Sequence, residues 1–254
     1  MKHYFLLTFF SFFILSCGEK AQALKEKSYL SFSKTYDKYV ENEFDYDGRD
    51  TILKRFKNEL STALNDEALK KYYFPKWDKK RAISVSKDST LTILSWDWEN
   101  NGTFHRYESM YRLVKNNKIY TGFLFEHDGG QKEIFSTVYY KSYSLPNSSF
   151  LVKGWGTHGG GKEFFVFRNL KLKNGRLQDC LSCFNGENQL FYEITRGKDN
   201  LEPKFDAVTN EISYHELTEN FVDGDKDSPS GFMDATGKIL RLQYKDGEFV
   251  KPNN

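Results

Sequence analysis

The chain has 254 residues, a formal net charge of +2 at pH 7 and an aromatic content of 17%. Its basic and acidic residues are interspersed, so the sequence lacks the basic block that nucleic acids or anionic lipid headgroups require of a partner. The length allows one substantial core or two small domains, and the abundance of Tyr and Phe favours strands.

Residues 1–16 have the pattern of a secretory signal. Lys2 supplies a positive start, and Phe5–Leu15 is apolar except for Thr8 and Ser11. The apolar run is about 11 residues long, whereas a membrane-spanning helix needs roughly 20. We therefore expect this segment to be removed on export and not to remain as a membrane span.

The sequence Ile14-Leu15-Ser16-Cys17 resembles a bacterial lipobox, with its aliphatic residue, its small residue and the cysteine directly after an apolar core. The resemblance implies that acyl chains on Cys17 anchor the protein to a membrane outside the cytoplasm. Two or three chains are needed for a firm anchor, since one holds only marginally. Gly18, which follows the cysteine, resembles the signal for outer-membrane routing. The alternative is an ordinary signal peptide that happens to contain a cysteine.

The first part of the mature chain is expected to be a polar tether over residues 17–27 and a helical segment over 28–74. Apolar residues recur at spacings of three and four, which predicts two amphipathic helices, the second with its N-cap at Asp50 and a break at Asp47-Gly48 before it. The two apolar stripes consist of Tyr29, Phe32, Tyr36, Tyr39 and Val40, and of Ile52, Leu53, Phe56, Leu60, Ala63 and Leu64.

Residues 82–252 change to a period of two with frequent turn signals, which predicts roughly nine to eleven antiparallel strands. Asn116-Asn117, Asn174-Gly175 and Asp246-Gly247 have the composition of tight hairpin turns. The expected fold is mainly β (α+β), with the N-terminal amphipathic helices packed on a long antiparallel meander. This meander could close as a barrel, a sandwich or a propeller-like sheet.

The segment from Ser86-Lys87-Asp88 through Ser95-Trp96-Asp97 to Gly102-Thr103 resembles a pattern in uncharacterised secreted proteins of the Bacteroidota type. Those proteins also begin with a helical segment and continue as β meanders. The resemblance implies an architecture and no activity.

Cys180 and Cys183 are the remaining cysteines and form a C-x-x-C sequence. Polar residues and a turn signal follow it, instead of the helix that a thioredoxin-type site needs. A disulfide requires a local turn, because residues three apart on a straight strand point to opposite faces. A structural disulfide, two unpaired thiols and a redox or metal pair all remain open.

A calcium loop is one candidate site, because Asp223, Asp225, Asp227 and Asp234 occupy relative positions 1, 3, 5 and 12. Ser228 stands where such loops have glycine, so a plain solvated loop is the alternative. We expect no cofactor other than calcium.

A second candidate site, for a sugar or peptide ligand, comprises Trp96, Trp98, Trp155 and His158, since aromatic rings beside polar groups suit such ligands. The sequence thus favours a non-catalytic binding or interaction module of the cell envelope, with an envelope protein or glycan as partner and no nucleic acid. One alternative is an envelope hydrolase that uses carboxylates and histidines, drawn from Asp97, His105, Glu126, His127 and Asp128. The other is a barrel that carries a small apolar ligand.

Overall fold

The structure is a computed structural model. It describes residues 35, 46–65, 81–101, 104–124, 137–157, 159–222 and 228–252. Within these ranges no helix combines the length and the apolar composition that crossing a bilayer requires. The chain divides into two compact units, Met1–Tyr73 and Phe74–Asn254, and each is described by itself.

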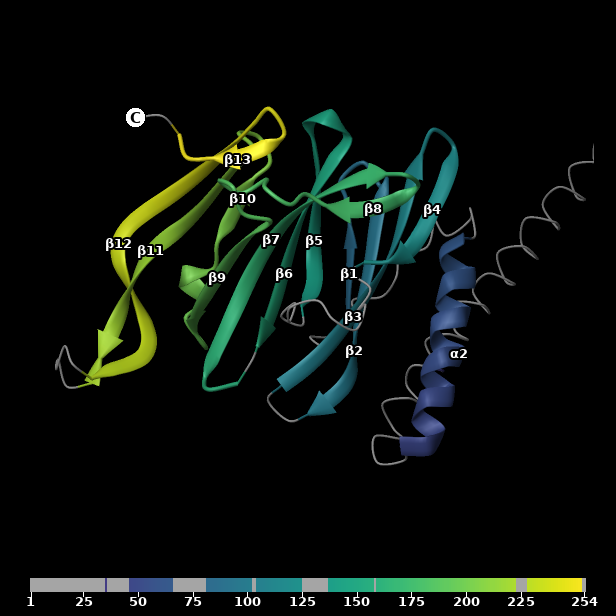
Figure 1. Cartoon of the computed structure of the whole chain (residues 1–254), viewed down its shortest axis with the longest axis horizontal. Helices are drawn as coiled ribbons and strands as arrows, with labels where there is room; N and C mark the ends of the chain where they lie inside the picture. The colour runs from purple at the N-terminus through teal and green to yellow at the C-terminus, as the bar shows by residue number, and fades with distance from the viewer. Residues whose placement is uncertain are drawn as a thin grey trace, which may run out of the picture. The chain divides into compact units, whose positions relative to one another are not determined.

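The first unit contains helix α2, Tyr46–Asn65 (Figure 1). The predicted second apolar stripe is its buried face, comprising Leu53, Phe56, Leu60, Ala63 and Leu64. Arg55 and Glu59 form an ion pair at 2.8 Å across one turn. The helix starts before Asp50, which is therefore not its N-cap, because the helical backbone continues through the predicted break at Gly48. The predicted first stripe lies outside the described residues.

The second unit is mainly β, as predicted. Its described strands are β1 (Arg81–Val85), β2 (Leu91–Asn101), β3 (Phe104–Lys115), β4 (Lys118–Phe123), β5 (Val138–Leu145), β6 (Ser149–Thr157), β7 (Lys162–Lys173), β8 (Arg176–Asp179), β9 (Gln189–Thr195), β10 (Lys204–Asp206), β11 (Glu211–Phe221), β12 (Pro229–Lys245) and β13 (Glu248–Val250). Two short 3₁₀ helices, Pro146–Ser148 and Asp199–Leu201, interrupt the series.

The strands form three antiparallel sheets, each following the order of the sequence (Figure 1). The first sheet is β1-β2-β3-β4 and the last sheet is β10-β11-β12-β13. The middle sheet is β5-β6-β7-β8, with β9 also paired to β7. In each described sheet the outer strands pair with a single neighbour, so the predicted meander is divided into separate sheets and does not run as one continuous sheet.

Tight turns join neighbouring strands where the sequence predicts them. Asn116 and Asn117, Asn174 and Gly175, and Asp246 and Gly247 all have positive φ, between 51° and 98°. Two successive residues with positive φ make the turn whose twist matches that of the flanking strands. Local turn chemistry therefore determines these three hairpins.

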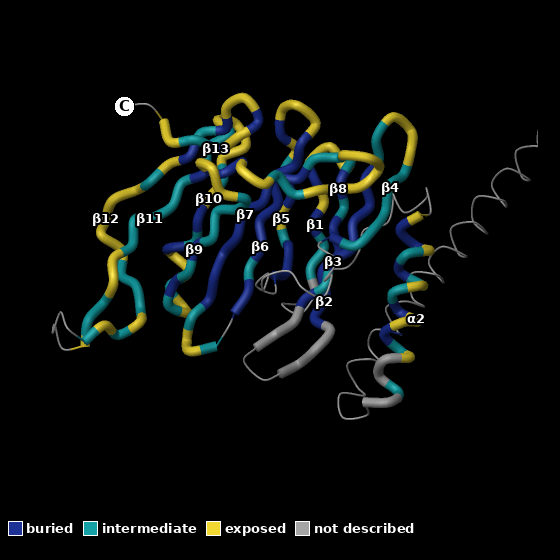
Figure 2. The backbone as a smooth tube through the Cα atoms, in the orientation of Figure 1, coloured by how far each residue is buried: buried dark blue, intermediate teal, exposed yellow. Residues whose placement is uncertain are grey.

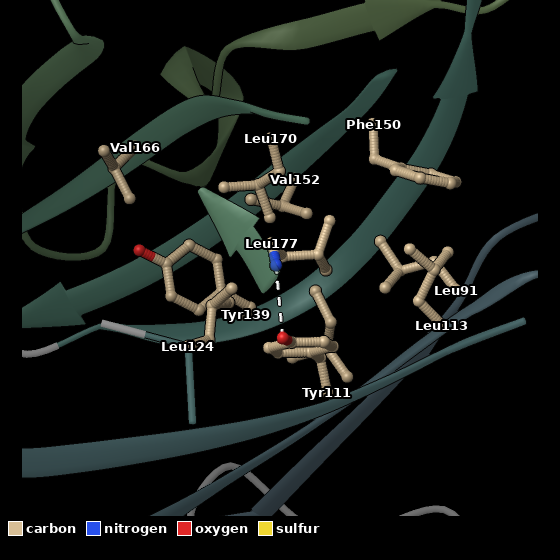
Figure 3. Close-up of a cluster of buried hydrophobic side chains, with 11 residues drawn as sticks. Leu91, Tyr111, Leu113, Leu124, Tyr139, Phe150, Val152, Val166, Leu170 and Leu177 are labelled. Atoms are coloured by element: carbon tan, nitrogen blue, oxygen red, sulfur yellow. Dashed lines mark hydrogen bonds between the residues drawn. The ribbon is translucent and has the colours of Figure 1, made fainter. Parts of the chain in front are cut away.

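The middle sheet is buried on both faces, and its central strands β6 and β7 are dark blue along most of their length in Figure 2. Because side chains alternate along a strand, one face of β6 and β7 packs on the first sheet and the other on the last. The first interface, shown in part in Figure 3, joins Phe150, Val152, Val166 and Leu170 to Leu91, Ile93, Tyr111 and Leu113. The second joins Leu151 and Phe167 to Ile212, Leu242, Tyr244 and Phe249.

Hydroxyl groups also connect the first and middle sheets. The Tyr111 hydroxyl accepts a hydrogen bond from the Leu177 backbone N–H at 3.1 Å, drawn as a dashed line in Figure 3. The Ser95 hydroxyl accepts one from the Tyr139 N–H at 3.0 Å, and the Ser84 hydroxyl donates to that of Ser142 at 2.7 Å. The two serine hydroxyls hold the edge strand β5 against the first sheet, and the Tyr111 hydroxyl holds β8 against it.

Candidate functional site

Charged and aromatic side chains gather on the face of the middle sheet that packs on the last sheet. We name this group the Lys153 cluster; it comprises Tyr140, Lys153, Trp155 and Glu163 from the sheet and Glu202 from the loop before β10. Lys153 and Trp155 share this face because they are two residues apart on β6. In the strand register Trp155 lies opposite Phe165, and Thr157 lies opposite Glu163. Strand alternation therefore places a lysine in a face that is otherwise largely apolar.

Lys153 is the buried centre of the cluster, with 2% of its surface exposed. Its ammonium group forms an ion pair with the Glu202 carboxylate and donates a hydrogen bond to the Pro203 carbonyl at 2.5 Å. The rings of Phe165, Phe167 and Tyr140 lie 5.3, 5.5 and 5.6 Å from the ammonium nitrogen. Burial lowers the pKa of Lys153, although the Glu202 carboxylate opposes the shift.

Glu202 accepts hydrogen bonds from two members of the cluster. The Tyr140 hydroxyl donates to its Oε1 at 2.9 Å, and Lys153 donates to the same oxygen. Partial burial opposes ionisation, but these two donors and the charge of Lys153 hold the pKa of Glu202 below its usual value. Burial, reinforced by the charge of Glu202, raises the pKa of Tyr140. The result is an ionised pair with a neutral phenol beside it.

Trp155 and Glu163 form the other half of the cluster. The indole N–H donates to Glu163 Oε2 at 2.9 Å, and the Gly197 backbone N–H donates to Glu163 Oε1 at 3.2 Å. Glu163 is buried, whereas Trp155 is half-buried. Both carboxylate oxygens are therefore engaged, and Oε2 holds the indole in one orientation with part of the Trp155 surface open.

The opposite face of the middle sheet carries a second buried ion pair, between Arg168 and Asp179 Oδ2 at 2.8 Å. The Arg168 guanidinium also donates to Gln189 Oε1 at 3.0 and 2.8 Å. Burial raises the pKa of Asp179 to about 6, against the opposing charge of Arg168. This pair joins β7, β8 and β9 within one sheet.

Of the four residues predicted to bind a ligand, Trp155 alone has a described side chain in the cluster. Trp96 is buried completely, with 0% exposure, so its indole offers no stacking surface to solvent. The side chain of Trp98 and the whole of His158 lie outside the described residues. Lys153 was not predicted from the sequence. The signal that could have identified it is a lysine between Val152 and Gly154 in an otherwise apolar strand. Tyr140, Glu163 and Glu202, which come from separate strands and a loop, were not predicted either.

Among the residues considered for hydrolysis, Asp97 is buried, with 6% exposure. Burial and then the charge of Asp97 raise the pKa of Tyr107. Glu126, His127, Asp128 and the side chain of His105 lie outside the described residues. Among the described residues, these candidates therefore form no arrangement of acid and base groups that supports the hydrolase hypothesis.

Three of the four aspartates of the predicted calcium loop, Asp223, Asp225 and Asp227, lie outside the described residues. The fourth, Asp234, forms an ion pair with Lys198, whose ammonium group lies 2.6 Å from Asp234 Oδ1. Across the described ranges, no three side chains of His, Cys, Asp or Glu gather as a metal site. The calcium loop stays a prediction.

A disulfide joins Cys180 to Cys183, whose Cα atoms are 5.6 Å apart. The two cysteines lie in a turn between β8 and β9, which is the local bend that such a bond requires. Cys17 lies outside the described residues.

Comparisons of the chain with protein-family models, with curated proteins and with solved structures found no match. No relative therefore assigns a role to the Lys153 cluster or to the disulfide.

Proposed function

We propose that this protein is an envelope lipoprotein, anchored through acyl chains on Cys17 and routed to the outer membrane, whose β unit is a non-catalytic binding module for an envelope glycan. The lipobox-like sequence before Cys17 supports the location. The disulfide between Cys180 and Cys183 supports it independently, because such bonds persist in oxidising compartments outside the cytoplasm.

The observation that carries the binding proposal is the half-buried indole of Trp155, held by Glu163. An aromatic face fixed in advance binds the apolar face of a sugar ring without a further loss of side-chain freedom. The Tyr140 ring lies in the same cluster and is held by Glu202. Two rings in fixed orientations with polar groups beside them suit a glycan ligand.

The pairing of the charged groups supports binding over catalysis. Glu163 accepts hydrogen bonds at both oxygens, and Glu202 is ionised against Lys153. A general acid needs a raised pKa, whereas the pKa of Glu202 is lowered. These carboxylates therefore act as supports for the aromatic rings.

The arrangement of the sheets favours a propeller-like stack over a barrel. Each described sheet contains a meander of four strands, and the middle one packs on a neighbour through each face. Propeller blades pack in this way, face against face. We therefore propose the propeller-like form. The alternative function, a barrel that carries a small apolar ligand in its lumen, then has no structural basis.

The test compares Trp155→Ala with Trp155→Phe in binding to purified peptidoglycan and outer-membrane polysaccharide, measured by calorimetry. We expect Trp155→Ala to weaken binding about fivefold and Trp155→Phe to retain most of it, since a stacked ring contributes about 1 kcal/mol. Equal affinity of Trp155→Ala and wild type would contradict the proposed site. Binding to an envelope protein with no binding to either glycan would assign the surface to a protein partner.

A further inference from the structure

The disulfide shapes residues 180–187 of the loop between β8 and β9, which we name the disulfide loop. Strands β8 and β9 both pair with β7, so the loop leaves and rejoins the same sheet. Within the loop, Phe184 and Glu187 exchange two backbone hydrogen bonds, at 2.9 and 3.0 Å. The disulfide and this small turn together give the loop a compact form.

The disulfide loop also binds the last strand of the last sheet. The Phe249 N–H donates to the Cys183 carbonyl at 2.6 Å, and the Asn185 N–H donates to the Phe249 carbonyl at 2.9 Å. On its other side β13 pairs with the end of β12. Strand β13 therefore lies between β12 and the disulfide loop, and these two bonds connect the backbones of the middle and last sheets.

Side chains reinforce the same junction. The rings of Phe184 and Phe249 stack at 5.1 Å with an interplanar angle of 6°, and Tyr244 packs on Phe249 at 5.0 Å. Phe249 and Cys183 are both completely buried. The position of Cys183 thus determines the placement of the acceptor carbonyl and of the ring that covers Phe249.

The two cysteine residues differ in their exposure to solvent. Cys183 is fully buried, whereas Cys180 is half-buried, and the intervening Leu181 is 80% exposed. Of the two cysteines, Cys180 is therefore the one that an external thiolate can approach, from the side of the exposed Leu181. The buried sulfur is the leaving group of that attack.

We propose that Cys180–Cys183 is a redox-controlled latch that holds β13 on the middle sheet and is opened by a dithiol reductant, such as the dithiol site of an oxidoreductase. One thiolate of the reductant attacks Cys180 Sγ, breaks the disulfide and forms a mixed disulfide, while Cys183 leaves as a thiolate and takes up a proton. The second reductant thiolate then attacks its own partner sulfur. Cys180 leaves and takes up a proton, and the reductant ends as a disulfide.

The effect of reduction is local because the bond closes a very short loop. Cys180 and Cys183 are three residues apart, so the bond restricts little of the unfolded chain. The contacts that remain between the two sheets include the packing of Leu151 with Ile212 and Leu242 and a hydrogen bond from the Asn169 side chain to the Gly247 carbonyl at 3.1 Å. Reduction therefore frees the disulfide loop and β13 but leaves the stacked sheets together.

The test measures amide hydrogen exchange of the full-length protein, oxidised and after treatment with a dithiol under native conditions. We expect peptides from residues 180–187 and 246–252 to exchange at least about tenfold faster after reduction, and peptides from β2 and β3 to be unchanged. The double variant Cys180→Ser, Cys183→Ser should match the reduced protein. Leu181→Ser, which keeps both cysteines, should match the oxidised one.

Three results would overturn the latch. Unchanged exchange at residues 246–252 would show that β13 does not depend on the disulfide. A uniform increase of the exchange rate across all three sheets would show that the disulfide stabilises the whole β unit and not β13 in particular. A disulfide that resists the dithiol until the protein is denatured would remove the redox control. The serine variants can fail to fold, but reduction of the folded wild type tests the proposal without them, and no ligand at Trp155 is involved.

Discussion

Lys153 in the centre of the middle sheet takes its counter-ion from Glu202, which lies 49 residues further along the chain, just before β10. The pair joins a buried strand to the segment that leads into the last sheet. A buried ammonium group without a partner is strongly unfavourable, so the fold depends on this long-range contact.

Glu202→Gln should lower the free energy of unfolding by about 2 kcal/mol, since it leaves Lys153 buried without a charged partner, while the partial exposure of Glu202 reduces the effect. Urea unfolding at pH 7 measures the change. The matched control is Glu216→Gln, which removes the carboxylate of an exposed ion pair with Lys238 and should leave the midpoint where it is. Lys153→Met should be much better tolerated than Glu202→Gln, because it removes the buried charge itself; an equal loss in both would refute this explanation.

Asp179 should make the unfolding free energy fall as the pH rises from about 4 to about 6. Its pKa is raised by burial from 3.8 to about 6 in the folded protein, so the folded state binds more protons than the unfolded state across this window. The stabilisation that Asp179 contributes is complete at pH values below its pKa in the unfolded chain. It is lost as the pH rises through its pKa in the folded protein. The change is on the order of 3 kcal/mol.

Asp179→Asn should remove this slope in urea unfolding measured at several pH values. Only the pH dependence is compared, because the variant also weakens the bond to Arg168. Asp206→Asn is the control: hydrogen bonds from Val208 and Thr209 lower the pKa of Asp206, which places its titration below the window. The same slope in wild type and Asp179→Asn would rule out Asp179 as the origin.

Gly154→Ala should destabilise the protein by about 2 kcal/mol or more, because the middle sheet has no room for the added carbon. A Cβ at Gly154 would lie 2.2 Å from Thr137 Cγ2 and 3.1 Å from the Tyr139 ring. Adding Thr137→Ser removes the nearer atom and should recover part of the loss. A double-mutant cycle of thermal unfolding measures the coupling; additive effects would show that the Thr137 contact is not the cause.

Cys17→Ser should release the protein from the membrane fraction, because the serine cannot carry the thioether-linked acyl chains of the proposed anchor. Cell fractionation and mass spectrometry of the amino terminus measure the change. Ser16→Ala retains a small residue before the cysteine and should remain membrane-bound. A Cys17→Ser variant that still needs detergent for extraction would disprove the acyl anchor.

The sequence by itself determined the local features of the fold. The apolar stripe from Leu53 to Leu64 predicts the buried face of α2, and Asn174-Gly175 and Asp246-Gly247 predict two of the hairpins. These features depend on residues that are neighbours in the chain, through helical spacing, strand alternation and the backbone conformations open to Asn and Gly. The mainly β class follows from the same local signals.

Only the tertiary structure decided how the strands divide into three sheets and which side chains meet. The sequence shows that Trp96 and Trp155 both lie in strands, but burial of the first and partial exposure of the second depend on what covers each face. The pairing of Lys153 with Glu202, and of Cys183 with Phe249, joins segments 49 and 66 residues apart (249 − 183 = 66). Contacts of this kind arise from the packing of whole sheets, and no local pattern of residues encodes them.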